Sequence, residues 1–139
     1  MSTTPTVTYQ LDPGTYEVLT DALEQHAAHL EQQTHEPLFA PTTEDRTQLL
    51  LGVLQADELR RAIEDAEHAG TVTLTLDPTT FGLLSAALAS YHADQQHAVE
   101  EATQVHDDPE DGDLARRAAA TADRLHVQAV EAAQFTSHN

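Results

Sequence analysis

One segment of this chain occurs twice, and the repeat limits the folds that the chain can adopt. Residues 6–23 recur at 71–88 with a constant offset of 65 positions, and ten of these eighteen positions carry the same residue. A chain of 139 residues is long enough for one core and too short for two large domains. We therefore expect one domain, 1–139, made of two similar halves, 6–70 and 71–135, with a frayed tail at 136–139. The identical positions, named in the first copy, are Thr6, Val7, Thr8, Leu11, Asp12, Pro13, Thr15, Leu19, Ala22 and Leu23.

Each half is predicted to begin with a strand that leads directly into a helix. Residues 6–11 and 71–76 alternate between polar and apolar side chains, or nearly so, which is typical of a strand with one wet face. An Asp-Pro pair follows in both halves, at Asp12 and Asp77. The aspartate side chain can accept hydrogen bonds from the free amides of a first helical turn, and proline is tolerated at that position.

Two helices are predicted to complete each half. Apolar side chains recur at steps of three and four along four segments, so that each segment has one apolar face. In the last segment, Leu114 and Leu125 are predicted to point inward. In the first half, Thr42 or Thr43 is expected to cap the second helix. The apolar positions of the four segments span 16–30, 49–66, 81–105 and 114–135, and the second helix begins after the cap at Thr42 or Thr43.

The ends of the first helical pair carry further signals. Gly70 is expected to close the second helix, because glycine adopts positive φ without strain. Two prolines interrupt the pattern between residues 32 and 41 and indicate a connector. Leu38 and Phe39 lie between these prolines, and we expect them to plug the end of the core.

A strand-helix-helix unit cannot cover the edges of its own strand, and an isolated two-stranded hairpin is marginally stable. We therefore predict an α+β fold that is predominantly helical, in which the two strands form an antiparallel ribbon about a pseudo-two-fold axis. The apolar side of the ribbon would pack on a four-helix bundle. The strands can pair within one chain or between two chains. A homodimer is expected, because alanine-rich helices with few aromatic residues give a thin core.

The charge of the chain is strongly negative. It has 24 acidic residues, six arginines and no lysine, for a formal net charge of -18. One explanation is adaptation to a salt-rich cytoplasm, where the charge is screened and carboxylates hold water and hydrated cations. The other is a basic partner. Because acidic residues are spread along both halves, we favour salt adaptation. The N-terminus lacks a signal-peptide pattern, and the apolar run 49–54 falls far short of the roughly 20 residues that cross a bilayer. We expect a soluble cytoplasmic protein with no membrane contact.

No catalytic signature is present in the sequence. Cysteine is absent, and so are a G-x-S-x-G motif, a glycine-rich phosphate loop and an H-E-x-x-H motif. Nine histidines make metal binding a natural question, but none of the candidate pairs repeats at the 65-residue offset. We expect no catalytic residue, no metal and no cofactor, and we interpret the histidines as solvated surface residues. The candidate pairs are His26 with His29, His92 with His97, and Glu64 with His68.

All six arginines fall in the second predicted helix of a half, and four form the adjacent pairs Arg60-Arg61 and Arg116-Arg117. One interpretation is pairing within the helix, for example of Arg60 with Glu64. The other is contact with a phosphate backbone or with an acidic partner surface.

The order of elements resembles that of the ribbon-helix-helix family of DNA-binding proteins. The resemblance covers both halves, and it implies that outward side chains of the ribbon read base edges while the starts of the second helices, near Thr42 and Thr43, contact phosphates. This chain departs from the family pattern in its longer helices, in a ribbon without Arg or Lys, and in its charge. The implied reading face is Thr6, Thr8, Gln10, Thr71, Thr73 and Thr75.

Two hypotheses about function follow. The first is a non-enzymatic, salt-adapted interaction or assembly module, whose partner is a second copy or another protein. The alternative is a ribbon-helix-helix-like DNA-binding regulator that uses the six ribbon positions. Arg60, Arg61, Arg116 and Arg117 are candidate basic contacts under either hypothesis.

Overall fold

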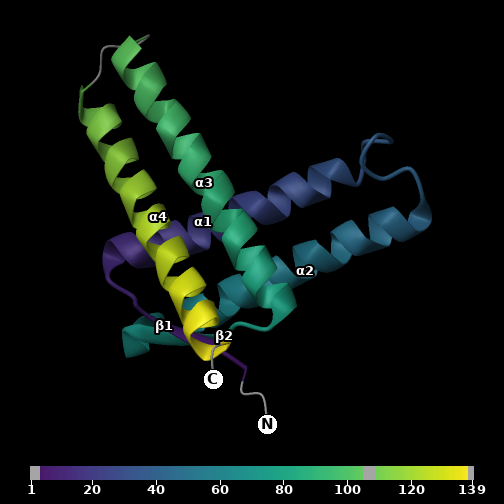
Figure 1. Cartoon of the computed structure of the whole chain (residues 1–139). Helices are drawn as coiled ribbons and strands as arrows, with labels where there is room; N and C mark the ends of the chain where they lie inside the picture. Colours follow the sequence, from purple (N-terminus) through teal and green to yellow (C-terminus); the bar gives the residue numbers. More distant parts are fainter. Residues whose placement is uncertain (1–3, 105–108, 138–139) are drawn as a thin grey trace.

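The computed structural model describes residues 4–104 and 109–137. The fold is mostly helical, with four long helices, one short 3-10 turn and a small two-stranded antiparallel sheet (Figure 1). The prediction of a predominantly helical fold with such a sheet is therefore confirmed. In chain order the elements are β1 (Thr6–Gln10), α1 (Pro13–Gln33), α2 (Thr43–Asp65), η1 (Glu67–Ala69), β2 (Thr71–Thr75), α3 (Pro78–Gln104) and α4 (Pro109–Ser137).

The two strands pair within the chain, in a register that sets Thr8 opposite Thr73. These two residues are also equivalent at the 65-residue offset, so the pairing sets equivalent positions of the sequence repeat opposite each other. The Leu11 amide donates to the Gly70 carbonyl at 2.7 Å. Because hydrogen-bonded and non-hydrogen-bonded pairs alternate along an antiparallel ladder, Thr8 and Thr73 form a non-hydrogen-bonded pair, whose side chains lie close together.

The predicted helix starts are confirmed. Oδ1 of Asp12 accepts a hydrogen bond from the amide of Thr15 at 2.9 Å, and Oδ1 of Asp77 accepts the equivalent bond from Thr80 at 2.8 Å. The bond from Thr15 is the main reason why the pKa of Asp12 lies below its ordinary value. Each strand is thus followed by a helix in which the aspartate caps one free amide of the first turn.

Helix α2 and the turn after it confirm two more signals. The Thr42 side chain accepts a hydrogen bond from the Asp45 amide at 3.1 Å. Gly70 has a φ of 78°, in the left-handed region, as predicted. Contrary to the prediction, Gly70 does not follow α2 directly, because α2 ends at Asp65 and η1 lies between that residue and Gly70.

The core lies between the inner face of the ribbon and the helices. Val7 and Leu74 project inward from the strands. Tyr9 is almost fully buried, and its hydroxyl donates to the Leu125 carbonyl at 2.7 Å, which ties β1 to α4. Burial raises the pKa of Tyr9, so this hydroxyl keeps its proton. The large helical side chains that are fully buried in the core are Leu19, Leu23, Ile63, Leu84, Leu88 and Leu125.

The helices form two antiparallel hairpins that cross. Figure 1 shows α3 beside α4 and α1 beside α2, with the far ends of the two hairpins pointing in different directions. Helix α1 contacts both α3 and α4, and it holds the hairpins together near the ribbon. Beyond this crossing, the outer part of the α1–α2 hairpin extends away from the rest of the molecule (Figure 1). We call this outer part the arm.

Two predictions about buried side chains were wrong. Leu38 and Phe39 do not plug the core, since they are 91% and 54% exposed in the loop at the end of the arm. Leu114 does not point inward, since it is 63% exposed. Helix α4 instead faces the core with small residues, which allow close packing on α3. These are Ala115, Ala119, Ala122 and Ala129, with Leu125 among them.

Helix α4 continues to Ser137, past the predicted start of the tail, and residues 138–139 lie outside the described ranges. None of the helices in the part of the chain that the structure describes carries an apolar stretch long enough to cross a bilayer.

Candidate functional site

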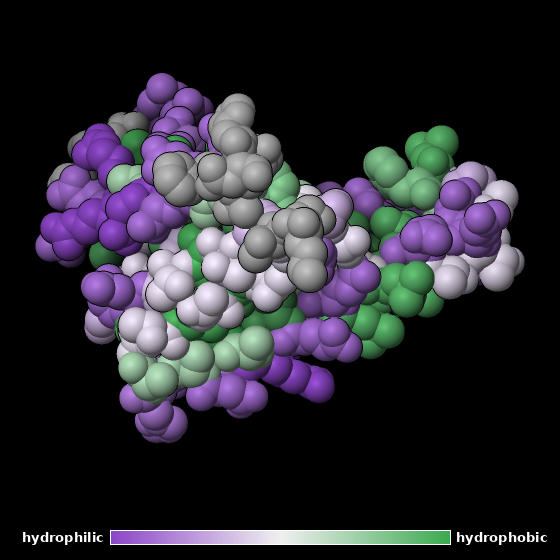
Figure 2. All heavy atoms as spheres, turned by 60° about the horizontal axis from the view of Figure 1, so that its bottom comes forward, coloured by the Kyte–Doolittle hydropathy of each residue, from purple (hydrophilic) through white to green (hydrophobic). Residues whose placement is uncertain are grey.

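Exposed apolar side chains gather on the arm. In the described ranges, seven large apolar residues are exposed, and five of them lie in α2 or in the loop before it. Figure 2 shows this apolar surface at the projecting end of the molecule. The other two, Leu114 and Val127, lie apart on α4. We call the five residues the arm surface, and their exposed fractions are 91% for Leu38, 54% for Phe39, 49% for Leu50, 44% for Leu51 and 59% for Leu54.

The helical period explains why α2 has two apolar faces. Ala56 and Ile63 are buried on the inner face, which packs on α1 and the body. Leu50 and Leu54 are one turn apart on the opposite face, where no element of the described chain covers them. Gly52 lets α1 approach closely, because a Cβ atom at this position would lie 2.9 Å from Cδ1 of Leu30. Helix α2 therefore presents leucines to α1 on one side and to solvent on the other.

Charged residues flank the leucines of α2. Glu44 and Arg46 precede them, Glu58 and Arg61 follow them, and all four side chains are exposed. None of the four forms an ion pair with another residue in the described ranges. Arg60 differs, since it lies 3.5 Å from Asp57 and 3.8 Å from Glu64 within the same helix. The charges beside the arm surface are thus available to a partner.

The structure brings the six predicted ribbon positions together on one exposed face. Oγ1 of Thr8 and Oγ1 of Thr73 are 2.9 Å apart at its centre. The threonines at both ends and Gln10 extend this face along the two strands. The face is polar and uncharged, and its members are Thr6, Thr8, Gln10, Thr71, Thr73 and Thr75.

The side chain of Arg124 lies beside this face, a position that the sequence did not predict. A polar pocket of about 230 Å³ is lined by Thr8, Gln10, Thr15 and Arg124, among others. The Arg124 guanidinium donates to the Thr15 hydroxyl at 3.1 Å. The 65-residue offset would match Arg124 with Leu59, so the repeat gives no hint of this arginine. Its position depends on the tertiary packing of α4 on β1.

The four arginines predicted as basic contacts do not form one patch. Arg60 and Arg61 lie on α2, whereas Arg116 and Arg117 lie on α4. Arg116 pairs with Asp113 at 3.0 Å in its own helix, as Arg60 pairs in α2. The prediction of pairing within the helix is therefore confirmed for Arg60, which lies near Glu64 as expected.

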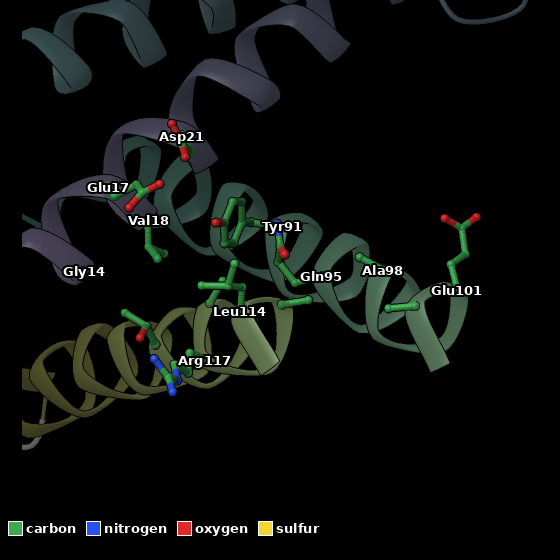
Figure 3. Close-up of a pocket in the computed structure, with 14 residues that line it drawn as sticks. Gly14, Glu17, Val18, Asp21, Tyr91, Gln95, Ala98, Glu101, Leu114 and Arg117 are labelled. Atoms are coloured by element: carbon green, nitrogen blue, oxygen red, sulfur yellow. The ribbon is translucent and has the colours of Figure 1, made fainter. Parts of the chain in front are cut away.

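A cleft with a volume of about 660 Å³ lies between α1, α3 and α4. Figure 3 shows Glu17 and Asp21 on the α1 wall, Arg117 on the α4 wall and Tyr91 of α3 between them. Burial, and then the charges of Asp21 and Glu17, raise the pKa of Tyr91.

Asp21 in this cleft gives a prediction about pH. Burial, followed by the charges of Glu17 and Glu24, raises its pKa above the ordinary value. Ionisation of Asp21 is therefore less favourable in the folded state than in the unfolded state, which lowers the free energy of unfolding. This loss of stability is absent below the ordinary pKa of 3.8 and reaches its full size above the raised pKa. We expect Asp21→Asn to raise the melting temperature at neutral pH, and the gain should vanish below pH 3.8.

The measurement is thermal unfolding by circular dichroism at both pH values. Asp94→Asn is the matched control, because Asp94 is exposed on α3 and should change little. An equal gain for Asp21→Asn at the two pH values would contradict the burial of its charge.

Metal ligands do not converge in the described ranges. No group of three or more His, Asp or Glu residues there is arranged so that it could hold an ion. His26 lies beside His29 on α1, and burial, with a smaller effect of the His29 charge, lowers its pKa. His97 instead lies 3.3 Å from Glu101, one turn away on α3.

Comparisons with known proteins add no relative. No protein-family model, curated protein or solved structure matches this chain. The likeness to ribbon-helix-helix proteins thus remains a likeness in the order of elements. The arm surface holds five of the seven exposed large apolar side chains in the described ranges.

One feature of the sequence, the apolar run at 49–54, indicates the arm surface although helical periodicity alone did not predict it. Residues 49–54 include five large or branched apolar side chains in six positions. One face of a helix can bury only some of them, because consecutive residues point about 100° apart. With Leu49 and Val53 partly buried on the inner side, the remaining leucines had to face outward.

Proposed function

We propose that this chain is a non-enzymatic, salt-adapted interaction or assembly module that binds a protein partner through the arm surface. The observation that carries the proposal is the exposure of Leu38, Phe39, Leu50, Leu51 and Leu54 on one arm. Large exposed apolar patches on soluble proteins commonly mark interaction sites. Full burial of a fully exposed leucine side chain is worth about 1.5–3 kcal/mol. Leu50, Leu51 and Leu54 are about half exposed, so each contributes roughly half of that to a partner that covers it.

The charge of the chain supports the salt-adapted part of the proposal. A net charge of -18 repels any acidic partner at low ionic strength. At 1 M salt the Debye length falls to about 3 Å, and the repulsion becomes short-ranged. The burial of apolar side chains does not depend on this charge repulsion. In a salt-rich cytoplasm an interface built on leucines would therefore form where one built on surface charges alone would be weak.

The proposal includes a tandem architecture, in which residues 6–70 and 71–135 are copies of one strand-helix-helix unit joined by the ribbon over a four-helix bundle. The ten identities in residues 6–23 support it. The register supports it too, because Thr8 and its copy Thr73 face each other. The equivalent caps at Asp12 and Asp77 are further support. The arm is then the helical hairpin of the first copy.

Photo-cross-linking in cells of a halophilic host tests whether the arm surface is a contact site. A photoreactive phenylalanine analogue replaces Leu54, and cross-linked products are identified by mass spectrometry. We expect a defined protein product. The matched control is the same analogue at Val127, which is 46% exposed on α4. Absence of a product at Leu54, or the same products at both positions, would contradict the proposal.

A second candidate function is sequence-dependent DNA binding by the ribbon. It is favoured by one observation, the exposed and nearly symmetric polar face centred on Thr8 and Thr73. Thr and Gln side chains can hydrogen-bond to base edges, and Arg124 beside the face could contact a phosphate. The net charge opposes this function at low salt.

Fluorescence anisotropy with genomic fragments in multimolar KCl tests the DNA hypothesis. Binding that is lost in the double variant Gln10→Ala/Thr73→Ala would support it, because both side chains lie on the exposed face. A matched variant on an exposed position away from the ribbon, Gln48→Ala, should bind as the wild type does. No binding by the wild type would eliminate the hypothesis.

A further inference from the structure

We infer that the partner that covers the arm surface is a second copy of this chain, docked with the two α2 helices antiparallel about a two-fold axis. The inference rests on the proposed function, and it names the partner. A two-fold interface is isologous, which means that the same patch is used by both copies and must complement itself. The sequence of charges and leucines along α2 meets this requirement in the antiparallel orientation.

The leucines match first. Leu50 and Leu54 lie one turn apart on the exposed face of α2. With the axis between them, Leu50 of one copy lies opposite the partner's Leu54, and the reverse contact occurs at the same time. Leu51 lies beside this contact and widens it. Two identical apolar stripes are thus buried against each other. Both stripes are removed from water when the copies dock, which is favourable.

The charges that flank the leucines match in the same orientation. Helix α2 carries Glu44 and Arg46 before the leucines and Glu58 and Arg61 after them. Antiparallel docking brings the start of one helix to the end of the other. Arg46 then comes near the partner's Glu58, and Glu44 near the partner's Arg61. A parallel pair would instead set each charge next to its own copy, which is repulsive.

An open groove at the other end of α2 completes the match. It lies between α2 and the start of α3, has a volume of about 570 Å³, and is lined in part by Leu59, Ala62 and Leu83. Antiparallel docking directs the end of the partner's arm toward this groove. Leu38 and Phe39 of the partner would then meet the apolar part of the groove, whereas Glu58 and Asp77 line its polar part. One occupant therefore accounts for both the loop and the helical part of the arm surface.

Sedimentation equilibrium in multimolar KCl tests the dimer. We expect the wild type to dimerise, and we expect Leu50→Gln/Leu54→Gln to weaken dimerisation by at least about 100-fold, since two symmetry-related pairs of contacts are lost. Circular dichroism should show unchanged helix content, because both residues are exposed in the single chain. Leu114→Gln/Val127→Gln is the control, because it removes two exposed apolar side chains from α4 and should leave the dimer intact.

Cysteine cross-linking tests the orientation, and the chain offers a clean background because it has no cysteine. Thr47→Cys and Glu58→Cys introduce thiols on the exposed face of α2, before and after the leucines. Position 58 is eleven steps after position 47, which is about 16 Å along a helix. A mixture of the two single variants should form disulfide-linked dimers, whereas each variant alone should not, because a disulfide needs Cα atoms within about 7 Å.

The outcomes separate the two proposals. Disulfides that form only in the mixture support antiparallel docking. Disulfides that form in each single variant by itself would overturn it in favour of a parallel pair. A wild type that stays monomeric at all concentrations would overturn the second copy as the partner. If Leu54 then cross-links to a different protein, the proposed function survives without this inference. If it cross-links to nothing, both fail.

Discussion

Replacement of Leu84 by alanine is expected to lower the free energy of unfolding by about 2–5 kcal/mol. Leu84 is fully buried on α3, within the cluster that joins the ribbon to the helices. Its loss removes apolar contacts and leaves a cavity that neighbours fill only in part. Native domains have total stabilities of about 5–15 kcal/mol, so the variant should lose a large fraction of its stability. Urea unfolding in multimolar KCl, followed by circular dichroism, measures the change.

The repeat supplies a matched pair for this experiment. Leu19 is equivalent to Leu84 at the 65-residue offset and is also fully buried, so Leu19→Ala should have an effect in the same range. Leu114→Ala serves as the control, because Leu114 is 63% exposed and should change the stability by less than about 0.5 kcal/mol. A small effect at Leu84 or Leu19, or an equally large one at Leu114, would contradict the core described for this fold.

Transfer from multimolar KCl to dilute buffer is expected to unfold the chain. The Debye length increases from about 3 Å at 1 M to about 10 Å at 0.1 M, so many carboxylates begin to repel one another. The net charge of -18 acts on a core whose α4 side consists mainly of alanines. We expect most of the helical circular dichroism signal to be lost on dilution and to return with salt.

A charge-reduced variant provides the control for the salt experiment. Glu24→Gln, Glu31→Gln and Glu131→Gln neutralise three exposed carboxylates on α1 and α4. Their combination should shift the folding midpoint to lower KCl while leaving the fold unchanged. A wild type that is fully folded in dilute buffer would refute the salt-adapted interpretation, and the acidity would then point to a basic partner.

Local signals in the sequence predicted much of the fold. The caps at Asp12 and Asp77 could be predicted because they depend on residues within one turn of each other. The alternation in residues 6–10 and 71–75 correctly separated buried from exposed strand positions. The positive φ of Gly70 followed from the absence of a side chain. Each of these signals acts over a few residues, so no knowledge of distant packing was needed.

Features that depend on tertiary packing could not be predicted in this way. The expectation that Leu38 and Phe39 plug the core assumed that the loop lies near it, but the crossing of the hairpins carries the loop away. The inward face of α4 was misplaced at Leu114, because so many alanines in α4 blur the apolar pattern. Arg124 meets the ribbon only through the packing of α4 on β1. The ribbon face itself was predicted residue by residue, whereas the arm surface emerged only from the structure.

The union of the two halves through a ribbon within one chain is tested most directly by the double variant Thr8→Cys/Thr73→Cys. The two side chains already touch, with their hydroxyl oxygens 2.9 Å apart, and the Cα atoms of a non-hydrogen-bonded antiparallel pair are about 4.5 Å apart, which suits a disulfide. After mild oxidation in multimolar KCl, denaturing electrophoresis without reductant and mass spectrometry should reveal a single chain that contains an internal disulfide. Free thiols, or chains linked to one another by disulfides, would contradict the account.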